Sequence, residues 1–397
     1  MTSSDLRRLA LSLLVAAACG GGGSSSKPPA PGGPNVVPIS VTGTGCSASA
    51  YFNEPCVSVT VCVPGTSQCQ VVNDVLLDTG STGLRVFKQA LSLPLAQVAA
   101  GGGTLGECIA YLDGASQWGP VVSADVVLGG EPAVTVPVHL VDATFATAPS
   151  ACTGSQTDPT SAGYNAILGL NEWDLDCGEG CVTSATNGYY FACTGSSCAP
   201  SVAPATSQVR NPVAALPLDG NGIVVRLPAV PRGGAPSISG ELVLGVGTRT
   251  NNAAPAGLTA FPLDPPGTTT PGELQTTIAG STIPSFLDTG SNGIFFPATT
   301  AALTTCPSPD TSWFCPASPV TVSATNASTT GSPSAAVSFE IESIQALGRS
   351  SGVGNVGGPS VGPSSVDFGL PFFFGRDVYV VVEGRKSTLG TGPVVAY

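Results

Sequence analysis

The chain repeats one pattern, an apolar run that ends in Asp-Thr-Gly-Ser, first as Val75-Leu-Leu-Asp-Thr-Gly-Ser81 and again as Phe286-Leu-Asp-Thr-Gly-Ser291. A second apolar run follows each copy, with Leu84, Val86 and Phe87 after the first and Ile294, Phe295 and Phe296 after the second. One copy alone would be weak evidence for a functional site, since Asp-Thr-Gly-Ser is also a good turn sequence. Two copies with matching flanks indicate two half-sites that meet in space. Two carboxylates on tight turns can together activate a water and protonate a leaving group.

The composition favours a β-rich, turn-rich protein of two domains or one large bilobal domain. The chain has 397 residues, of which 42% are hydrophobic and only 10% are charged, with 51 Gly and 36 Pro. Helical proteins of this size usually carry more Glu, Lys and Arg. β-branched runs predict strands over residues 36–41, 56–62 and 70–77. Short helices are expected only at 87–95 and 298–303, and the Ser-, Thr- and Pro-rich stretch 308–336 is expected to be a surface excursion.

Charge and histidine content exclude several classes of function. The net charge is −12 with 13 Lys and Arg residues, so no basic stripe is available for phosphates and no nucleic-acid partner is expected. His139 is the single histidine, which rules out a multi-His metal site. A Ser-His-Asp or Cys-His enzyme would depend on His139 alone, and its place in the apolar run 134–141 favours a structural role. We therefore expect no metal and no cofactor.

The N-terminus predicts export. Arg7 and Arg8 precede the short apolar stretch 9–18, which is too short to span a membrane, and the stretch ends in Ala-Ala-Ala-Cys19. This ending resembles the lipobox of bacterial lipoproteins, so we expect residues 1–19 to be a signal peptide with Cys19 lipidated. The alternative is a plain signal peptide with a chance cysteine. Residues 20–35 are Gly-, Ser- and Pro-rich and predict a flexible tether. The expectation is a lipoprotein anchored to a membrane and facing the periplasm or the cell surface.

Cysteine usage agrees with an oxidising compartment. Of 13 cysteines, Cys19 is assigned to the anchor, and the even remainder predicts up to six disulfides. Cys62 with Cys69 could close a hairpin and Cys306 with Cys315 a small loop, whereas the pairing stays open in two clusters, Cys46/Cys56 and Cys177/Cys181/Cys193/Cys198. Zinc is the alternative for the second cluster, but its spacing is not the common two-residue knuckle, so disulfides are favoured.

Five ordered stretches, spread over most of residues 40–397, resemble pepsin-like aspartic proteases: Val75–Val86, Tyr111–Gly119, Asn165–Leu170, Phe286–Ser291 and the tail from Phe368 to Val394. More narrowly, the chain resembles an uncharacterised family of bacterial lipoproteins with the pepsin fold. The resemblance implies an all-β, bilobal fold with an active-site cleft between two β lobes. We expect an N-terminal lobe over residues 36–220 and a C-terminal lobe over 221–397.

The resemblance also implies roles for individual residues. Asp78 and Asp288 would form the catalytic pair, which holds one proton because two close carboxylates cannot both ionise cheaply; aspartic proteases are the established example. Thr79 and Thr289 would tie the two turns together, and Gly80 and Gly290 would direct their N–H groups to a carboxylate. Ser81 and Ser291 would hydrogen-bond the outer carboxylate oxygens. A flap would close over the substrate with Tyr111, Asp113 and Gly114, and Asp113 could equally serve the hairpin turn.

Two departures from the family pattern keep a second function open. Arg85 stands where the family has an aromatic residue that braces the flap tyrosine, and Leu112 replaces a flap glycine. The first hypothesis is an exported, monomeric aspartic endopeptidase that acts on peptides or proteins. The alternative is a non-catalytic binding lipoprotein of the bacterial envelope that keeps the cleft. The hypothesis of a purely structural envelope protein is weaker, since such a protein needs neither aspartate.

Overall fold

Strands dominate the residues that the computed structural model describes, which are 33–42, 51–301, 303–347, 350–360 and 365–397. Residues 33–397 belong to one unit. The expected signal peptide, Cys19, residues 20–32 of the tether and Cys46 lie outside the described residues. The prediction of an all-β protein is confirmed.

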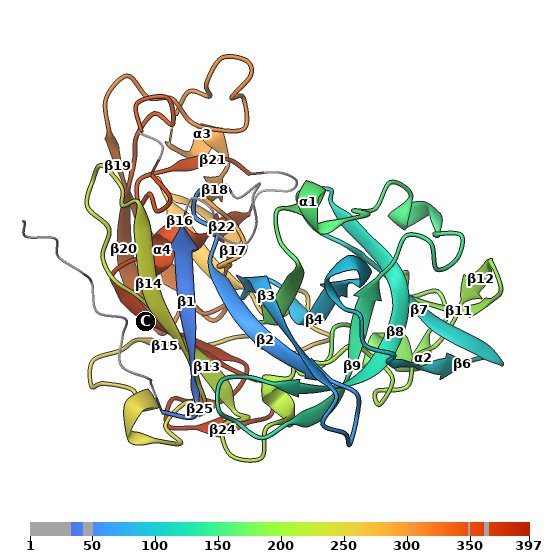
Figure 1. Cartoon of the computed structure of the whole chain (residues 1–397). Helices are drawn as coiled ribbons and strands as arrows, with labels where there is room; N and C mark the ends of the chain where they lie inside the picture. Colours follow the sequence, from blue (N-terminus) through green and yellow to red (C-terminus); the bar gives the residue numbers. More distant parts are fainter. Residues whose placement is uncertain (1–32, 43–50, 302, 348–349, 361–364) are drawn as a thin grey trace, which may run out of the picture. The chain divides into compact units, whose positions relative to one another are not determined.

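Within the described part, the strands form a seventeen-stranded sheet, a seven-stranded sheet and a two-stranded ribbon. The strands of the largest sheet are β1 (Val36–Thr42), β2 (Cys56–Cys62), β3 (Cys69–Asp78), β4 (Thr82–Phe87), β5 (Ala96–Gln97), β6 (Ala99–Ala100), β7 (Gly103–Ala110), β8 (Ser116–Val127), β9 (Val134–Val141), β10 (Ala166–Leu170), β11 (Tyr190–Thr194), β12 (Ser197–Pro200), β13 (Gly222–Leu227), β14 (Ser237–Leu244), β15 (Ala260–Pro262), β23 (Arg376–Val381) and β26 (Val394–Ala396). Those of the seven-stranded sheet are β16 (Leu274–Ile278), β17 (Ser281–Leu287), β18 (Ile294–Phe296), β19 (Val320–Ala327), β20 (Ser334–Ile341), β21 (Gly357–Pro359) and β22 (Val366–Phe368). The ribbon pairs β24 (Lys386–Ser387) with β25 (Gly390–Thr391). Figure 1 shows β19, β20 and β21 on one side of the fold, β7, β8 and β11 on the other, and β3 and β4 between them.

The repeated sequence pattern folds into the same local structure twice. β3 pairs in parallel with β10, and β4 pairs antiparallel with the same strand, so β10 lies beside both strands that flank the first turn. In the second copy, β17 pairs in parallel with β22 and β18 pairs antiparallel with it. Buried apolar residues before each turn hold these strands in the core. Each Asp-Thr-Gly-Ser turn is therefore fixed on both flanks by one central strand.

Within the described ranges, helices are few and short, as the composition predicts. They are α1 (Pro159–Ala162), α2 (Glu179–Thr183), α3 (Ala298–Ala301), α4 (Leu370–Phe373) and the 3-10 turns η1 (Lys88–Ala90), η2 (Ser150–Cys152), η3 (Val213–Ala215) and η4 (Thr250–Asn252). The helix expected over 87–95 is reduced to η1. Pro94 disfavours helical backbone at Leu93, and the Gln70 side chain bonds the Ala90 carbonyl and the Ser92 N–H, which keeps this segment extended.

The expectation of a surface excursion over 308–336 is wrong for its second half. Residues 320–327 form β19, which pairs with β16 and β20 inside the seven-stranded sheet. Small and β-branched residues alternate along β19, and its inward positions, which include Val322 and Ala324, are buried. Ser and Thr at the alternate positions face outward, so a composition that indicates a loop is also that of a half-buried strand.

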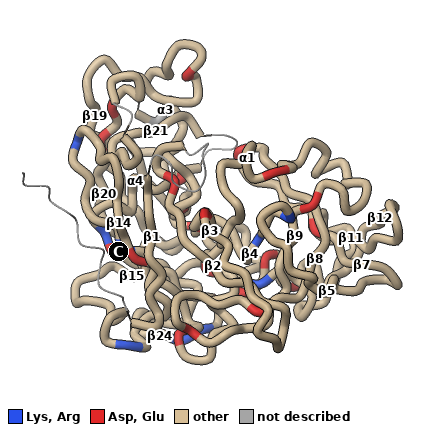
Figure 2. The backbone as a smooth tube through the Cα atoms, viewed as in Figure 1, with Lys and Arg blue, Asp and Glu red and all other residues tan. Residues whose placement is uncertain are grey.

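The charged residues are as sparse along the fold as the composition requires. Figure 2 shows Lys and Arg scattered over the backbone trace, with no continuous basic face in that view. Among the described residues, no helix is long enough and apolar enough to cross a membrane.

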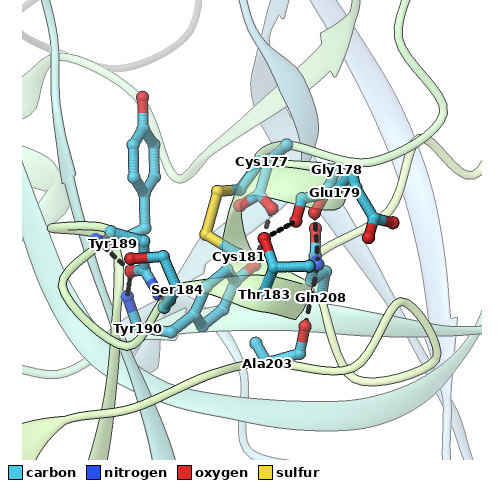
Figure 3. Close-up of a disulfide and its surroundings, with 12 residues drawn as sticks. Cys177, Gly178, Glu179, Cys181, Thr183, Ser184, Tyr189, Tyr190, Ala203 and Gln208 are labelled. Atoms are coloured by element: carbon cyan, nitrogen blue, oxygen red, sulfur yellow. Dashed lines mark hydrogen bonds between the residues drawn. A yellow bond between two sulfur atoms is a disulfide. The ribbon is translucent and has the colours of Figure 1, made fainter. Parts of the chain in front are cut away.

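Five disulfides join described cysteines to one another, and two of them were predicted from the sequence. The expected pairs Cys62–Cys69 and Cys306–Cys315 form. The open cluster resolves into Cys177–Cys181 and Cys193–Cys198. Figure 3 shows the Cys177–Cys181 disulfide, which joins the chain before α2 to a residue within α2. Gln208 lies beside it, and its amide donates to the carbonyls of Gly178 and Ala203.

The fifth disulfide has no local sequence signal. Cys108 of β7 bonds Cys152 of η2, across a sequence separation of 44 residues. Both cysteines pack with Trp118 and Phe191 in a small apolar cluster. In the chain-entropy model, a loop of this length corresponds to about 4 kcal/mol of stabilisation, the most among the five. Cys56 is disulfide-bonded as well.

Candidate active site

The two Asp-Thr-Gly-Ser turns meet, and threonine hydrogen bonds join them reciprocally. The Thr79 N–H donates to Thr289 Oγ1 at 3.0 Å, and the Thr289 N–H donates to Thr79 Oγ1 at 3.0 Å. The Thr79 hydroxyl donates to the Leu287 carbonyl at 2.9 Å and the Thr289 hydroxyl to the Leu77 carbonyl at 2.7 Å. Both threonines are buried. Each hydroxyl thus accepts one bond and donates another, which leaves no buried polar group of the pair unsatisfied.

The glycines of the turns lie against the carboxyl group of the opposite turn. The Gly80 N–H donates to Asp78 Oδ1 and the Gly290 N–H to Asp288 Oδ1, each at 2.7 Å. A Cβ atom added at Gly80 would lie 2.6 Å from Asp288 Cγ, and one added at Gly290 would lie 2.9 Å from Asp78 Oδ1. Only glycine fits at either position, and the two carboxyl groups face each other across the turns.

Serine hydroxyls hold the second oxygen of each carboxyl group. Ser81 Oγ donates to Asp78 Oδ2 at 2.5 Å. Ser291 Oγ lies 2.9 Å from Asp288 Oδ2 and 2.6 Å from Asp367 Oδ2. Asp367 belongs to β22 and was not among the residues that the sequence singled out. The available signal was a lone acidic residue inside the apolar run Val366-Asp-Phe368.

Burial and like charge make the site retain protons. Burial and the negative charge of Asp78 raise the pKa of Asp288 well above its ordinary value. Burial also raises the pKa of Asp367, to about 8, and the nearby Asp78 adds to the effect. A carboxyl group that holds its proton beside an ionised partner is the arrangement required for acid and base roles in one site.

The predicted flap residues form the turn of the β7–β8 hairpin. The Gly114 N–H donates to the Tyr111 carbonyl, and Gly114 has a positive φ of 88°, which glycine adopts without strain. The Asp113 carboxylate accepts the Ala115 N–H at 2.8 Å, so it stabilises the turn. The Tyr111 hydroxyl donates to Gln117 Oε1 at 3.1 Å, and Leu112 at the tip is 68% exposed.

Two adjoining cavities make up the cleft around these residues. The larger, of about 400 Å³, is lined by Asp78, Asp288, Asp367 and the flap residues Tyr111 to Asp113. The smaller, of about 240 Å³, is lined among others by Glu172, Trp173 and Leu274. Gly80, Leu112 and Phe286 line both cavities, so the paired carboxyl groups lie along a continuous cleft. Its described lining contains acidic side chains but no Lys, Arg or His.

Arg85 lies behind the first turn in a buried charge network that the sequence did not reveal. Arg85 Nη2 lies 2.8 Å from Glu107 Oε1 and 3.2 Å from Asp176 Oδ2, and Arg85 also donates to the Thr82 carbonyl. Burial opposes the charge of Glu107, but Arg85 and His139 outweigh it and lower the pKa of Glu107. Burial and Glu107 raise the pKa of Asp176, so one charged carboxylate balances one guanidinium.

His139 belongs to this network and not to the described lining of the cleft. It is fully buried in β9, with Nδ1 3.4 Å from Glu107 Oε2. Burial lowers the pKa of His139 to about 4, against the opposing effect of Glu107. Among the described residues, no group of three or more His, Cys, Asp and Glu side chains is placed to hold a metal ion.

Comparison with known proteins gives a family and a fold. The family model described as "Protein of unknown function (DUF3443)" matches residues 31–397. The chain belongs to this family. No curated protein matches it. Among solved structures, this member of the family is similar to the aspartic proteinase from Irpex lacteus, with a TM-score of 0.52 and 15% identity, over 91% of this chain and 96% of that one. At this identity the likeness shows the fold alone, which is the bilobal pepsin-like fold predicted from the sequence.

Proposed function

We propose that this chain is an aspartic endopeptidase that hydrolyses peptide bonds with a water activated by Asp78 and Asp288. The observation that carries the proposal is the pair of carboxyl groups held face to face in a cleft by reciprocal threonine bonds. Each carboxyl group accepts a backbone N–H and a serine hydroxyl. Such fixed geometry positions reacting groups before the substrate arrives.

In the proposed mechanism, the pair enters the reaction with one proton. The ionised carboxylate removes a proton from water, whose oxygen forms a bond to the peptide carbonyl carbon, while the protonated carboxyl gives its proton to the carbonyl oxygen. The tetrahedral intermediate then breaks its carbon–nitrogen bond, and the nitrogen leaves with a proton from the pair. At the same time the ionised carboxylate takes a proton from one hydroxyl of the intermediate, which becomes the product carboxyl group and restores the single proton of the pair. The raised pKa of Asp288 supports retention of the shared proton. The titration belongs to both residues, so the base is assigned to the pair.

The supporting residues follow from the same proposal. Thr79 and Thr289 keep the two turns in register, and Gly80 and Gly290 let the carboxyl groups approach. Ser81 and Ser291 orient the outer oxygens. Tyr111 and Leu112 of the flap would cover a bound peptide, with Asp113 and Gly114 shaping the turn.

A peptide-library digest from strongly acidic to neutral pH tests the proposal. We expect cleavage with an acidic optimum, blocked by a statine-type inhibitor, whose hydroxyl replaces the attacking water. Asp78→Asn should remove cleavage, whereas the matched surface variant Asp377→Asn should retain it, since Asp377 pairs with Arg226 away from the cleft. Cleavage that resists statine inhibitors but stops with chelators would contradict the mechanism, because the pair works without a metal.

The second candidate is a non-catalytic binding protein, favoured by the two departures at the flap. Arg85 is engaged in ion pairs in place of an aromatic brace, and Leu112 is an exposed apolar residue at the flap tip. If the purified protein cleaves no library peptide but binds one equally well before and after Asp78→Asn, the binding function replaces the protease.

The same proposal includes export and anchoring. Five disulfides among the described residues are typical of proteins from an oxidising compartment. We propose residues 1–19 as signal peptide, 20–35 as tether, 36–220 and 221–397 as the two lobes, and a monomer anchored through lipidated Cys19. Changing Cys19 to Ser should release the protein from membranes or leave an unprocessed precursor. Wild-type protein that is already fully released from membranes would contradict the anchor.

A further inference from the structure

Asp367 is an acidic residue at a place where the other half of the site has an apolar one. In the strand ladders, Asp367 of β22 lies opposite Phe286 of β17, and Ile167 of β10 lies opposite Leu76 of β3. These four residues line the same cavity. Because the two halves repeat one construction, Asp367 is the structural counterpart of Ile167.

The hydrogen-bond inventory at Ser291 requires a proton on a neighbouring carboxyl group. Ser291 Oγ lies within hydrogen-bond distance of one oxygen of Asp288 and one of Asp367, at 2.9 and 2.6 Å. A serine hydroxyl has a single proton and can donate to only one of them. For both contacts to be hydrogen bonds, one carboxyl group must itself be protonated and donate to Ser291.

Burial assigns that proton to Asp367. Asp367 Oδ1 is buried and has no hydrogen-bond partner among the described residues, so an ionised Asp367 would carry a half-satisfied buried charge. Asp288 Oδ1, by contrast, accepts the Gly290 N–H. Of the titratable groups, Asp78 acts on Asp367, and Asp288 shares the Ser291 hydroxyl with it. Both are acidic, and no Lys, Arg or His is among the described residues lining this cavity. The pKa of Asp367, about 8, agrees with a neutral carboxyl group.

We propose that Asp367 is a positioning residue of the active site: its carboxyl group donates to Ser291, and Ser291 donates to the outer oxygen of Asp288. This inference rests on the proposed function. Accepting a hydrogen bond strengthens the one that a hydroxyl donates, so the chain from Asp367 through Ser291 stabilises the ionised form of the catalytic pair. In the part of the chain that the structure describes, Ser81 supports Asp78 without such a third group.

The first test is the acid limb of kcat/KM for peptide cleavage, which reports the first ionisation of the free pair. Asp367→Ile introduces the counterpart residue and removes the donor. Its acid-limb pKa should rise by roughly 0.5–1 unit, because the ionised pair loses support. Asp367→Asn keeps an N–H donor and should recover most of the shift. Asp367→Ala serves as the second donor-free variant if the Ile variant does not fold. Coincident acid limbs in the wild type and the donor-free variants would overturn the inference while leaving the protease function intact.

The second test needs no activity and compares Tm with pH. Folded Asp367 holds its proton up to about pH 8, whereas an unfolded aspartate releases it near pH 4. The wild type therefore loses stability relative to Asp367→Asn as pH rises from about 4 to about 8. Asp377→Asn, at an exposed position, should show no such trend. Parallel curves of Tm against pH for the wild type and Asp367→Asn would contradict the inference that Asp367 is protonated and donates to Ser291. This result can be read even if the wild type cleaves nothing and the protease function fails.

Discussion

The two half-sites share a backbone construction but differ in what surrounds it. In each half an aspartate ends or follows a buried strand, a second strand leaves the turn, and one central strand pairs with both. Each aspartate accepts a glycine N–H at the same distance of 2.7 Å. The backbone repeat therefore accounts for the symmetry of the paired carboxyl groups.

The side chains around the turns break this symmetry. In the first half, Arg85 occupies the seventh position after Asp78 and is buried among carboxylates. In the second half, the seventh position after Asp288 is Phe295, whose ring packs 5.5 Å from that of Trp313 and lines the cleft. The strands therefore determine the geometry of the carboxyl groups, whereas the neighbouring side chains determine how each half responds to protons.

The largest expected effect comes from removing either member of the pair. Asp78→Asn and Asp288→Asn should each lower kcat on the order of 10⁴-fold or more, and the double variant should be little worse than either single one, because both hold one shared proton. Folding should survive, since Asn keeps the shape and relieves like-charge repulsion. The checks are peptide cleavage rates and Tm. Clearly additive losses, or substantial activity in one variant, would show that the halves work independently.

The next largest effect is expected from the buried charge network around Arg85, which the second half lacks at the equivalent position. Arg85→Met leaves Glu107 and Asp176 buried without their cation, which should lower the free energy of unfolding by about 3–5 kcal/mol. Adding Glu107→Leu should recover part of the loss, since the remaining charge is then removed. Denaturant unfolding of the three proteins measures both effects. An Arg85→Met variant as stable as the wild type would mean that the network does not hold the first half.

The threonines test the symmetry directly. Thr79→Val and Thr289→Val each leave a backbone N–H and a carbonyl of the opposite turn without a partner, so each should cost about 2–4 kcal/mol of unfolding free energy. Because the bonds are reciprocal, the two losses should agree within about 1 kcal/mol. Denaturant unfolding of both single variants measures the two losses of unfolding free energy. A large difference between them would place the main support of the site in one half.

The smallest expected effect is a pH trend in the first half, opposite in sign to that of Asp367. His139 has a folded pKa of about 4 against an unfolded value of about 6.5. Its contribution to stability is therefore present above pH 6.5 and is lost as pH falls towards 4. As the pH falls from 6.5 towards 4, the Tm of the His139→Gln variant should decrease less than the Tm of the wild type. Tm curves that remain parallel from pH 7 to pH 4 would contradict a neutral, buried His139.

Much of the fold and the core of the candidate site could be predicted from the sequence because their signals are local. The two Asp-Thr-Gly-Ser turns, the β-branched runs around them and the flap turn at Tyr111 to Gly114 each act over a few residues. The disulfides Cys62–Cys69 and Cys306–Cys315 also close short loops. In contrast, β19 was hidden in a Ser- and Thr-rich stretch, because its strand character depends on pairing with β16 and β20.

By itself, the sequence determined that two equivalent carboxyl turns exist and that the chain is built from strands. Tertiary structure alone decided which distant groups meet: Asp367 reaches Asp288 through Ser291, Arg85 meets Glu107 and Asp176, and Cys108 bonds Cys152. The physical reason is that turn and strand preferences arise from neighbouring residues. Burial, ion pairing and the resulting pKa shifts arise from groups that come together only when the strands pair.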